Sequence, residues 1–192
     1  MNYLAHFYLA GDSDELVVGN FIGDAVKGND YLNYPEKIKQ GILMHRAIDS
    51  FTDSHPIVRQ STQRLQEHYH KFSGILVDVF YDHFLAKNWS TFHTKELNDF
   101  AQESYKTLEE NSLHLPEKAQ FMLPYMKNGN WLYNYIYMEG IKRTLGGMSR
   151  RSKFENNMHL GTTHLQEFYS EFENEFLDFF PQLIEHVAPY KS

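Results

Sequence analysis

The chain has 192 residues, 42% hydrophobic and 16% aromatic, which supports one sizeable core and predicts a single domain over residues 1–192. It has no cysteine, which excludes disulfides and thiolate metal sites and leaves His, Asp and Glu as metal ligands. Its formal net charge of −7 argues against nucleic acid as the main partner, because neutralising phosphates requires clustered Lys and Arg.

Apolar residues recur at helical spacing along the chain, and alternating runs bounded by hairpin turns are scarce. The pattern predicts an all-α fold, a helical bundle. The expected helices cover residues 2–10, 14–27, 35–52, 56–72, 74–89, 94–111, 117–127, 131–145 and 154–179. The opening MNYLAHFYLAGDSDELVV lacks a basic leader, and no window approaches the ~20 apolar residues of a membrane span. We therefore expect a cytoplasmic protein with no membrane partner.

The first two expected helices each carry one polar candidate. His6 shares a short amphipathic helix with apolar residues, and alone it would mean little. In ELVVGNFIGDAVKG, Asp24 shares a face with Val17 and Phe21, which predicts that it points inward. Gly19 and Gly23 would allow another helix to approach this one closely. Asp24 could bind a metal ion or cap a neighbouring helix.

The third expected helix contains GILMHRAIDSFTDSH at residues 41–55. At about 100° per residue, His45 and Asp49 fall on the same narrow arc as Ile38 and Ile42, with Asp53 a little further round. Side chains four residues apart converge on one point in space. A charge buried there is costly unless it is paired or bound to a metal, so this segment requires a partner.

A later segment, GILVDVFYDHFLAKNW, is so apolar around its circumference that it predicts a central helix. It nevertheless holds Asp78 and Asp82 four residues apart, with His83 adjacent. Ionisable groups on a buried helix need compensation. Repulsion would keep one of the two carboxylates protonated unless a cation lies between them.

The C-terminal part of the sequence offers one basic cluster and one aromatic stripe. In KRTLGGMSRRSK, residues 142–153, five cations occur with no acidic residue among them. This segment could be a solvated helix end or a surface that attracts an acidic partner. Further on, Phe168, Phe172, Phe176 and Phe179 recur at helical spacing, which indicates core packing.

Together, several helices would bring imidazole and carboxylate groups to one interior site, as helical bundles do when they bind metals. Such a set favours Mn²⁺, Fe²⁺, Mg²⁺ or Zn²⁺. A divalent metal lowers the pKa of a bound water, so hydroxide can attack phosphorus. Hydrolysis of a phosphate ester is therefore the leading chemistry. Arg46 could reach the substrate phosphate or brace a neighbouring carboxylate.

Five blocks in this order resemble the acyl carrier protein phosphodiesterase family: NYLAH, GNFIGD, GILMHRAIDSFTD, DVFYDHFL and GMSRR. The resemblance implies a divalent cation, usually Mn²⁺. It implies hydrolysis of the phosphodiester that links 4′-phosphopantetheine to a serine of holo acyl carrier protein. The family is regarded as a divergent relative of the all-α HD-domain metal phosphohydrolases, so the fold is expected to be HD-like, although the adjacent pair here runs Asp82–His83. The implied metal-site residues are His6, Asp24, His45, Asp49, Asp82 and His83.

The mechanism expected from this resemblance is in-line attack of an activated water on phosphorus. Arg46 would stabilise the phosphoryl charge, Asp53 would orient or deprotonate the water, and Asp78 would assist. Acyl carrier proteins are small and strongly acidic, so the basic cluster, with Arg143, Arg150 and Arg151, would bind this substrate.

Two other functions stay open. One keeps the metal site and takes a nucleotide or another small phosphate ester as substrate. The other is a non-catalytic helical module that binds an acidic partner and keeps its polar interior for packing specificity. The sequence does not specify the oligomeric state.

Overall fold

A computed structural model describes residues 1–191. These residues form helices and no strand, which confirms the all-α prediction. The α-helices are α1 (Tyr3–Ala10), α2 (Asp14–Ile22), α3 (Glu36–Ser54), α4 (Pro56–Tyr69), α5 (Ser73–Lys87), α6 (Trp89–Phe92), α7 (Leu97–Glu110), α8 (Glu117–Asn128), α9 (Trp131–Asn134), α10 (Met138–Arg151), α11 (Gly161–Glu167) and α12 (Tyr169–Val187). Short 3-10 helices are η1 (Asp30–Asn33), η2 (His70–Phe72), η3 (Ser112–His114), η4 (Met158–Leu160) and η5 (Ala188–Lys191).

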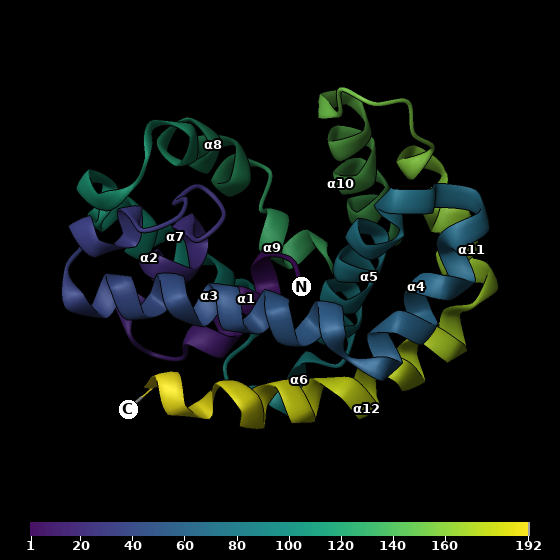
Figure 1. The fold of residues 1–192 in the computed structure, drawn as a ribbon, viewed down its shortest axis with the longest axis horizontal. Helices are drawn as coiled ribbons and strands as arrows, with labels where there is room; N and C mark the ends of the chain where they lie inside the picture. The colour runs from purple at the N-terminus through teal and green to yellow at the C-terminus, as the bar shows by residue number, and fades with distance from the viewer. Residues whose placement is uncertain (192) are drawn as a thin grey trace.

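The helices form two groups, and the long helices α3 and α12 run across both of them (Figure 1). One group contains α2, α7 and α8, and the other contains α4, α5, α10 and α11. Helix α12 runs below both groups and packs against α3, α4 and α5. The N-terminus lies between the groups, where α8 and α10 stand on opposite sides. Within residues 1–191, no helix is both long and apolar enough to cross a bilayer.

Helix α5 forms the centre of the core. Its apolar side chains except Ile75, which is 39% exposed, are buried, and Leu76, Phe80 and Phe84 are fully buried, which confirms the prediction of a central helix. Phe172 and Phe176 of α12 are also fully buried, and each contributes about 1.5–3 kcal/mol of hydrophobic stabilisation. The aromatic stripe is therefore core packing, as its spacing predicts.

Glycines set the distance between α2 and α3 and so place the candidate site. A Cβ atom on Gly19 would lie 2.6 Å from the Cα of Gly41, so the two backbones touch directly. A Cβ atom on Gly23 would lie 2.3 Å from the Cγ of His45. Side chains at these positions would push α3 away. The close helix approach predicted from Gly19 and Gly23 is present, and it brings the His45 ring against the end of α2.

Two expected helices differ from their predicted extents: one ends early, and the other divides in two. Helix α2 ends at Ile22 instead of residue 27, and the carbonyls of Val26 and Gly28 accept hydrogen bonds from Arg46 instead of helical N–H groups. The segment 131–145 divides into α9 and the start of α10, which runs on to Arg151. A Cβ atom on Gly140 would lie 1.9 Å from the carbonyl oxygen of Asn134, so only glycine allows this sharp fold.

The segment 154–179 does not begin as a helix. Residues 152–157 form a loop in which Ser152 and Asn156 side chains hydrogen-bond to nearby backbone groups, including the carbonyl of Phe154. Such local hydrogen bonds compete with helical ones. The helical part then divides at Phe168 into α11 and α12.

Candidate metal centre

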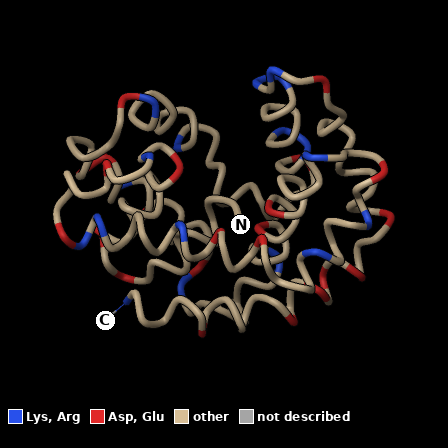
Figure 2. Tube along the Cα trace, in the orientation of Figure 1, with Lys and Arg blue, Asp and Glu red and all other residues tan. Residues whose placement is uncertain are grey.

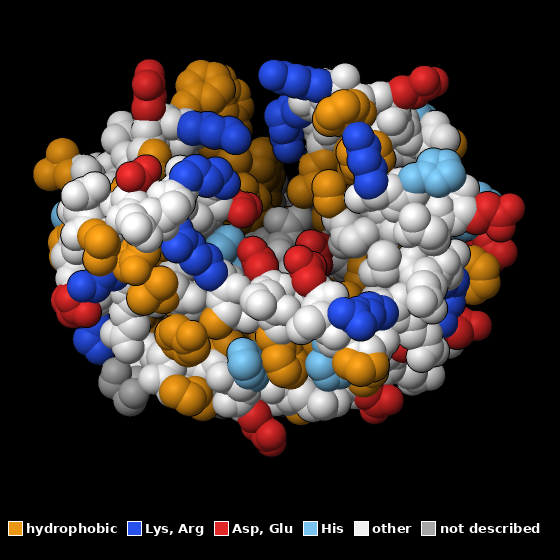
Figure 3. Space-filling model, in the orientation of Figure 1, with side chains coloured by type: hydrophobic (Ala, Val, Ile, Leu, Met, Phe, Trp, Pro, Cys, Tyr) orange, Lys and Arg blue, Asp and Glu red, His pale blue; other side chains and the backbone are white. Residues whose placement is uncertain are grey.

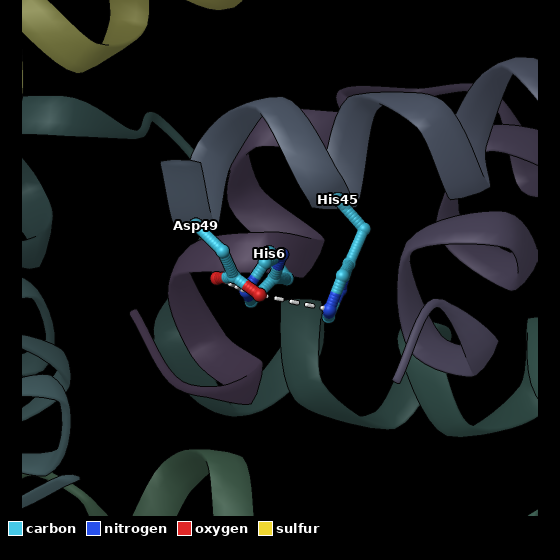
Figure 4. Close-up of side chains that lie close together, drawn as sticks. All are labelled: His6, His45 and Asp49. Carbon is cyan, nitrogen blue, oxygen red and sulfur yellow. Dashed lines mark ion pairs between the residues drawn. The ribbon is translucent and has the colours of Figure 1, made fainter. Parts of the chain in front are cut away.

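Two helices bring together three of the predicted ligands (Figure 4). His6 comes from α1, and His45 and Asp49 lie one turn apart on α3. The Nε2 atom of His6 lies 3.2 Å from Oδ1 of Asp49, and Nε2 of His45 lies 3.0 Å from Oδ2 of the same carboxylate. One ligand atom from each residue lies within 4.8 Å of the others. The arrangement is compact enough for one cation.

Asn20 of α2 fixes the orientation of both imidazole rings. Its side-chain Oδ1 lies 3.2 Å from Nδ1 of His6, and its backbone carbonyl lies 2.8 Å from Nδ1 of His45. The amide of Asn20 is itself held because Nδ2 donates to the carbonyl of Leu16. A histidine that donates its Nδ1 proton to an oxygen presents Nε2 as a free ligand atom. Both rings therefore turn Nε2 toward Asp49.

Asp24 lies beside these three residues, in the turn that follows α2. Its Oδ1 is 3.4 Å from Nε2 of His45, yet its side chain is 84% exposed. The prediction that Asp24 points inward on a helical face is wrong, because α2 ends at Ile22 before reaching it. Asp24 instead stands at the solvent side of the cluster.

The cluster holds opposite charges together. Burial alone would lower the pKa of His45, but the carboxylates of Asp24 and Asp49 outweigh burial and raise it to about 9. Burial would raise the pKa of Asp49, but the two imidazoles outweigh this and hold it well below its ordinary value. The ion pair with His45 also lowers the pKa of Asp24. Burial lowers the pKa of His6, so that ring is neutral at neutral pH.

The donor set fits a divalent cation. Two imidazole nitrogens and a carboxylate oxygen suit Mn²⁺, Fe²⁺ or Zn²⁺, whereas Mg²⁺ prefers oxygen ligands. The Nε2 atom of His45 is buried and, among residues 1–191, has no partner in hydrogen-bonding geometry although Asp49 is close. This nitrogen and the Asp49 oxygen lie 3.0 Å apart outside hydrogen-bonding geometry, so both are available to bind the same cation.

Asp78, on α5, lies next to the cluster, whereas Asp53 lies near the C-terminal end of α3. Oδ1 of Asp78 accepts a 2.9 Å hydrogen bond from the Met1 ammonium, which is 3.8 Å from Asp49. These carboxylates raise the pKa of the ammonium to about 10 against the opposing effect of burial, and burial raises the pKa of Asp78. Asp53 is exposed and lines a separate depression with Asp78 and Arg59.

Asp82 and His83 lie outside the group of three. Both oxygens of Asp82 accept backbone N–H groups at the start of α1, from Asn2, Leu4 and Ala5. Burial raises the pKa of Asp82 to about 7, with these N–H donors acting in the opposite direction. His83 faces a different part of the core. Its Nδ1 lies 2.7 Å from the carbonyl of Tyr135, and its Nε2 lies 3.0 Å from the hydroxyl of Tyr169.

Arg46 serves the backbone beside the site. Its guanidinium donates to the carbonyls of Val26 and Gly28 and stacks over the ring of Tyr31. These contacts hold the chain after α2. The sequence suggested that Arg46 could brace a neighbouring carboxylate. In the structure it binds backbone carbonyls instead, and no carboxylate within residues 1–191 forms an ion pair with it.

A cavity of about 320 Å³ opens from the cluster toward α10. His6, Asp24 and His45 line one side, and Arg143, Arg150 and Arg151 line the other. Among residues 1–191 none of these arginines forms a salt bridge, so their positive charges are available to an anion. The space-filling view shows a hollow between the two groups of helices, with acidic side chains at its floor and basic ones on the α10 side (Figures 2 and 3).

Tyr3 stands between the acidic and basic sides of this cavity. Burial raises its pKa to about 12, Asp24 adds to the rise and Arg151 opposes it. Its hydroxyl donates to the sulfur of Met122, which ties α1 to α8. The phenol is therefore neutral at physiological pH. It forms an uncharged part of the wall.

Sequence reasoning did not single out Asn20 or Tyr3. Asn20 lies four residues before Asp24 in the helix expected over residues 14–27, so the spacing that indicated Asp24 also indicates Asn20. An uncharged amide on a helix face gives no sign of its acceptor, however. Tyr3 lies in an aromatic-rich opening and has no distinguishing spacing.

Comparison with known proteins identifies the family of this chain. A model of the acyl carrier protein phosphodiesterase family matches residues 1–183. Acyl carrier protein phosphodiesterases from Photorhabdus laumondii subsp. laumondii and Yersinia pestis are each 32% identical to this chain over 96% of its length, covering 94% and 96% of those proteins. The Escherichia coli O6:H1 protein is 31% identical over 98% of both chains. No solved structure matches. This chain is therefore a member of the acyl carrier protein phosphodiesterase family.

Proposed function

We propose that this protein hydrolyses the phosphodiester between 4′-phosphopantetheine and a serine of holo acyl carrier protein, releasing the apo protein and 4′-phosphopantetheine. The observation that carries the proposal is one cavity lined both by His6 and His45 of the cluster and by three arginines that form no salt bridge among residues 1–191. Metal-type donors and anion-binding cations are the two components that phosphoester hydrolysis requires. Membership of the family supplies the substrate class.

The cluster is the proposed site of a divalent cation. His6, His45 and Asp49 would hold it, and Asp24 is placed to complete the set. Mn²⁺ is the first choice from the family and Fe²⁺ is an alternative, whereas the two imidazole nitrogens make Mg²⁺ a poorer fit. Such a cation would lower the pKa of a bound water and polarise a phosphoryl oxygen. Asp82 and His83, with their other hydrogen-bond partners, are left out of the proposed ligand set.

The protein's own residues would position the substrate. Guanidinium groups bind phosphate oxygens in a planar, two-pronged geometry, and Arg143, Arg150 and Arg151 face the cluster across the cavity. They would hold the phosphoryl group and stabilise the charge that builds on it. Asp24, ionised at neutral pH, would accept a hydrogen bond from the attacking water and orient it.

Mass spectrometry tests this function directly. Holo acyl carrier protein incubated with the enzyme and Mn²⁺ should lose the mass of 4′-phosphopantetheine, and a chelator should abolish the loss. Small phosphate esters, including nucleotides, are assayed in parallel. An intact carrier protein beside turnover of small esters would contradict the proposal and favour a small-ester phosphohydrolase. A cytoplasmic location stays a prediction.

A further inference from the structure

Two aromatic side chains of α8 are exposed to solvent. Phe121 is 70% exposed and Tyr125 is 58% exposed, and their ring centroids are 5.4 Å apart. The neighbouring Met122 of the same helix lines the cavity. We call Phe121 and Tyr125 the α8 aromatic pair. Exposed aromatic clusters of this kind mark interaction surfaces, since folding gains nothing from leaving them in water.

Helix α10 forms the facing rim. Thr144, Gly147, Arg150 and Arg151 line the cavity from α10, while Met122 lines it from α8. In the space-filling view, hydrophobic and basic side chains lie on both sides of the hollow (Figures 1 and 3). Helix α8 thus contributes the exposed aromatic pair, and α10 contributes arginines that form no salt bridge among residues 1–191.

We infer that the α8 aromatic pair and the α10 arginines are the two halves of one docking surface for the acidic carrier protein. The inference rests on the proposed function. A serine-linked phosphodiester must reach the cluster inside the cavity while the carrier protein itself stays outside, so the carrier protein contacts the rims. Uncompensated cations on α10 attract an acidic protein and orient it. Exposed Phe and Tyr beside them supply the apolar contact that stabilises such complexes.

A paired variant tests the α8 aromatic pair. Phe121→Ser combined with Tyr125→Ser removes both rings, and the high exposure of these residues makes the change tolerable for folding. Leu160→Ser is the matched control, since Leu160 is 50% exposed in η4 and does not line the cavity. Binding is measured by fluorescence anisotropy of labelled holo acyl carrier protein, with chelator present to prevent turnover. Kinetics with Mn²⁺ are measured on holo acyl carrier protein and on bis(4-nitrophenyl) phosphate.

The paired variant should weaken carrier-protein binding about tenfold or more and raise KM for holo acyl carrier protein similarly, as loss of a central aromatic contact does. Hydrolysis of bis(4-nitrophenyl) phosphate should stay at the wild-type rate, which a folding defect would lower. The Leu160→Ser control should match the wild type in every assay.

Three outcomes would overturn the inference. Unchanged binding and KM in an active paired variant would remove the α8 aromatic pair from the docking surface and leave the proposed function intact. Failure of the wild type to bind or hydrolyse holo acyl carrier protein would contradict both the docking surface and the proposed function. A wild-type dimer in analytical ultracentrifugation that the paired variant dissociates, with carrier-protein binding unchanged, would assign the pair to a second copy of this chain.

Discussion

The α1–α3 cluster and the α5 pair start from the same sequence pattern and reach opposite outcomes. Each combines histidine and aspartate on a mostly apolar helix. Around Asp49 the carboxylate faces two imidazole nitrogens, and a cavity opens beside it. Around Asp82 the carboxylate accepts three backbone N–H groups and is fully buried. Amino-acid type therefore does not separate a ligand from a structural cap. The two roles differ in the partner that each polar atom has in the folded structure.

Replacement of His45 with alanine should have the largest effect, because it removes one imidazole from the α1–α3 cluster. Without one imidazole the proposed site loses its cation, whose contribution of several kcal/mol corresponds to at least roughly 10³-fold in rate. Phosphodiester hydrolysis with Mn²⁺ should fall by about that factor, and the rise in melting temperature on adding Mn²⁺ should disappear. His159→Ala, an exposed histidine on η4, is the control and should retain both. Full activity of His45→Ala would end the metal-centre proposal.

Replacement of Asp82 with alanine should damage stability instead. Three backbone N–H groups at the start of α1 would lose their acceptor in a buried site, a loss of roughly 3 kcal/mol in the free energy of unfolding. Urea denaturation measures it. Asp82→Asn keeps one acceptor oxygen and should lose less. Both variants should still gain stability from Mn²⁺, and a variant that lost this gain would show that Asp82 belongs to the metal site after all.

The fold could be predicted where the pattern was long and strongly periodic. The apolar circumference of α5 and the phenylalanine stripe of α12 indicated buried helices, and both are buried. Helix ends were predicted less well, because tertiary contacts decided them. Gly140 folds α10 back on Asn134, and Arg46 binds carbonyls that would otherwise continue α2. Neither contact has a local signature.

The sequence indicated the three residues that the structure groups, His6, His45 and Asp49, but not the residues that support them. Helical spacing indicated His45 and Asp49 because convergence four residues apart is a local property. His6 joins them from a different helix; its own spacing marked it only as a possible extra imidazole, and the family resemblance implied it as a metal-site residue. The partners of Asp82 are backbone groups, which are the same in every sequence, so no pattern could reveal that this carboxylate was already satisfied.

Removal of the Asn20 side chain should lower the metal affinity of the α1–α3 cluster without abolishing metal binding. In Asn20→Ala the ring of His6 loses its Nδ1 partner, whereas His45 keeps its partner because the backbone carbonyl remains. Loss of such a supporting hydrogen bond lowers metal affinity by about 10–100-fold. Isothermal titration with Mn²⁺ measures the change. The control is Asn88→Ala, which removes a side-chain amide hydrogen bond to Glu173. It should leave the affinity for Mn²⁺ unchanged.

The pH dependence of metal binding sharpens the comparison further. The pKa of His45 is about 9 in the metal-free protein, above its ordinary value of 6.5, so a proton occupies the ring at neutral pH. A metal ion must displace it. Affinity should therefore rise about tenfold per pH unit up to about pH 9, with release of about one proton measured by titration in buffers of different ionisation enthalpy. The imidazolium stabilises the metal-free fold fully below pH 6.5, and this contribution is lost as pH rises through 9. Metal affinity independent of pH would contradict this account.

The smallest effect is expected at His83, where sequence reasoning placed a ligand and the structure shows two neutral hydrogen bonds. Changing His83 to leucine leaves the Tyr135 carbonyl and the Tyr169 hydroxyl without this partner, a loss of about 1–2 kcal/mol in the free energy of unfolding. Mn²⁺ affinity and kcat should stay at their wild-type values. His83→Gln can retain one hydrogen bond and should recover part of the stability. A hundredfold loss of Mn²⁺ affinity in either variant would instead place His83 within reach of the cation, and the distinction between the two regions would fail.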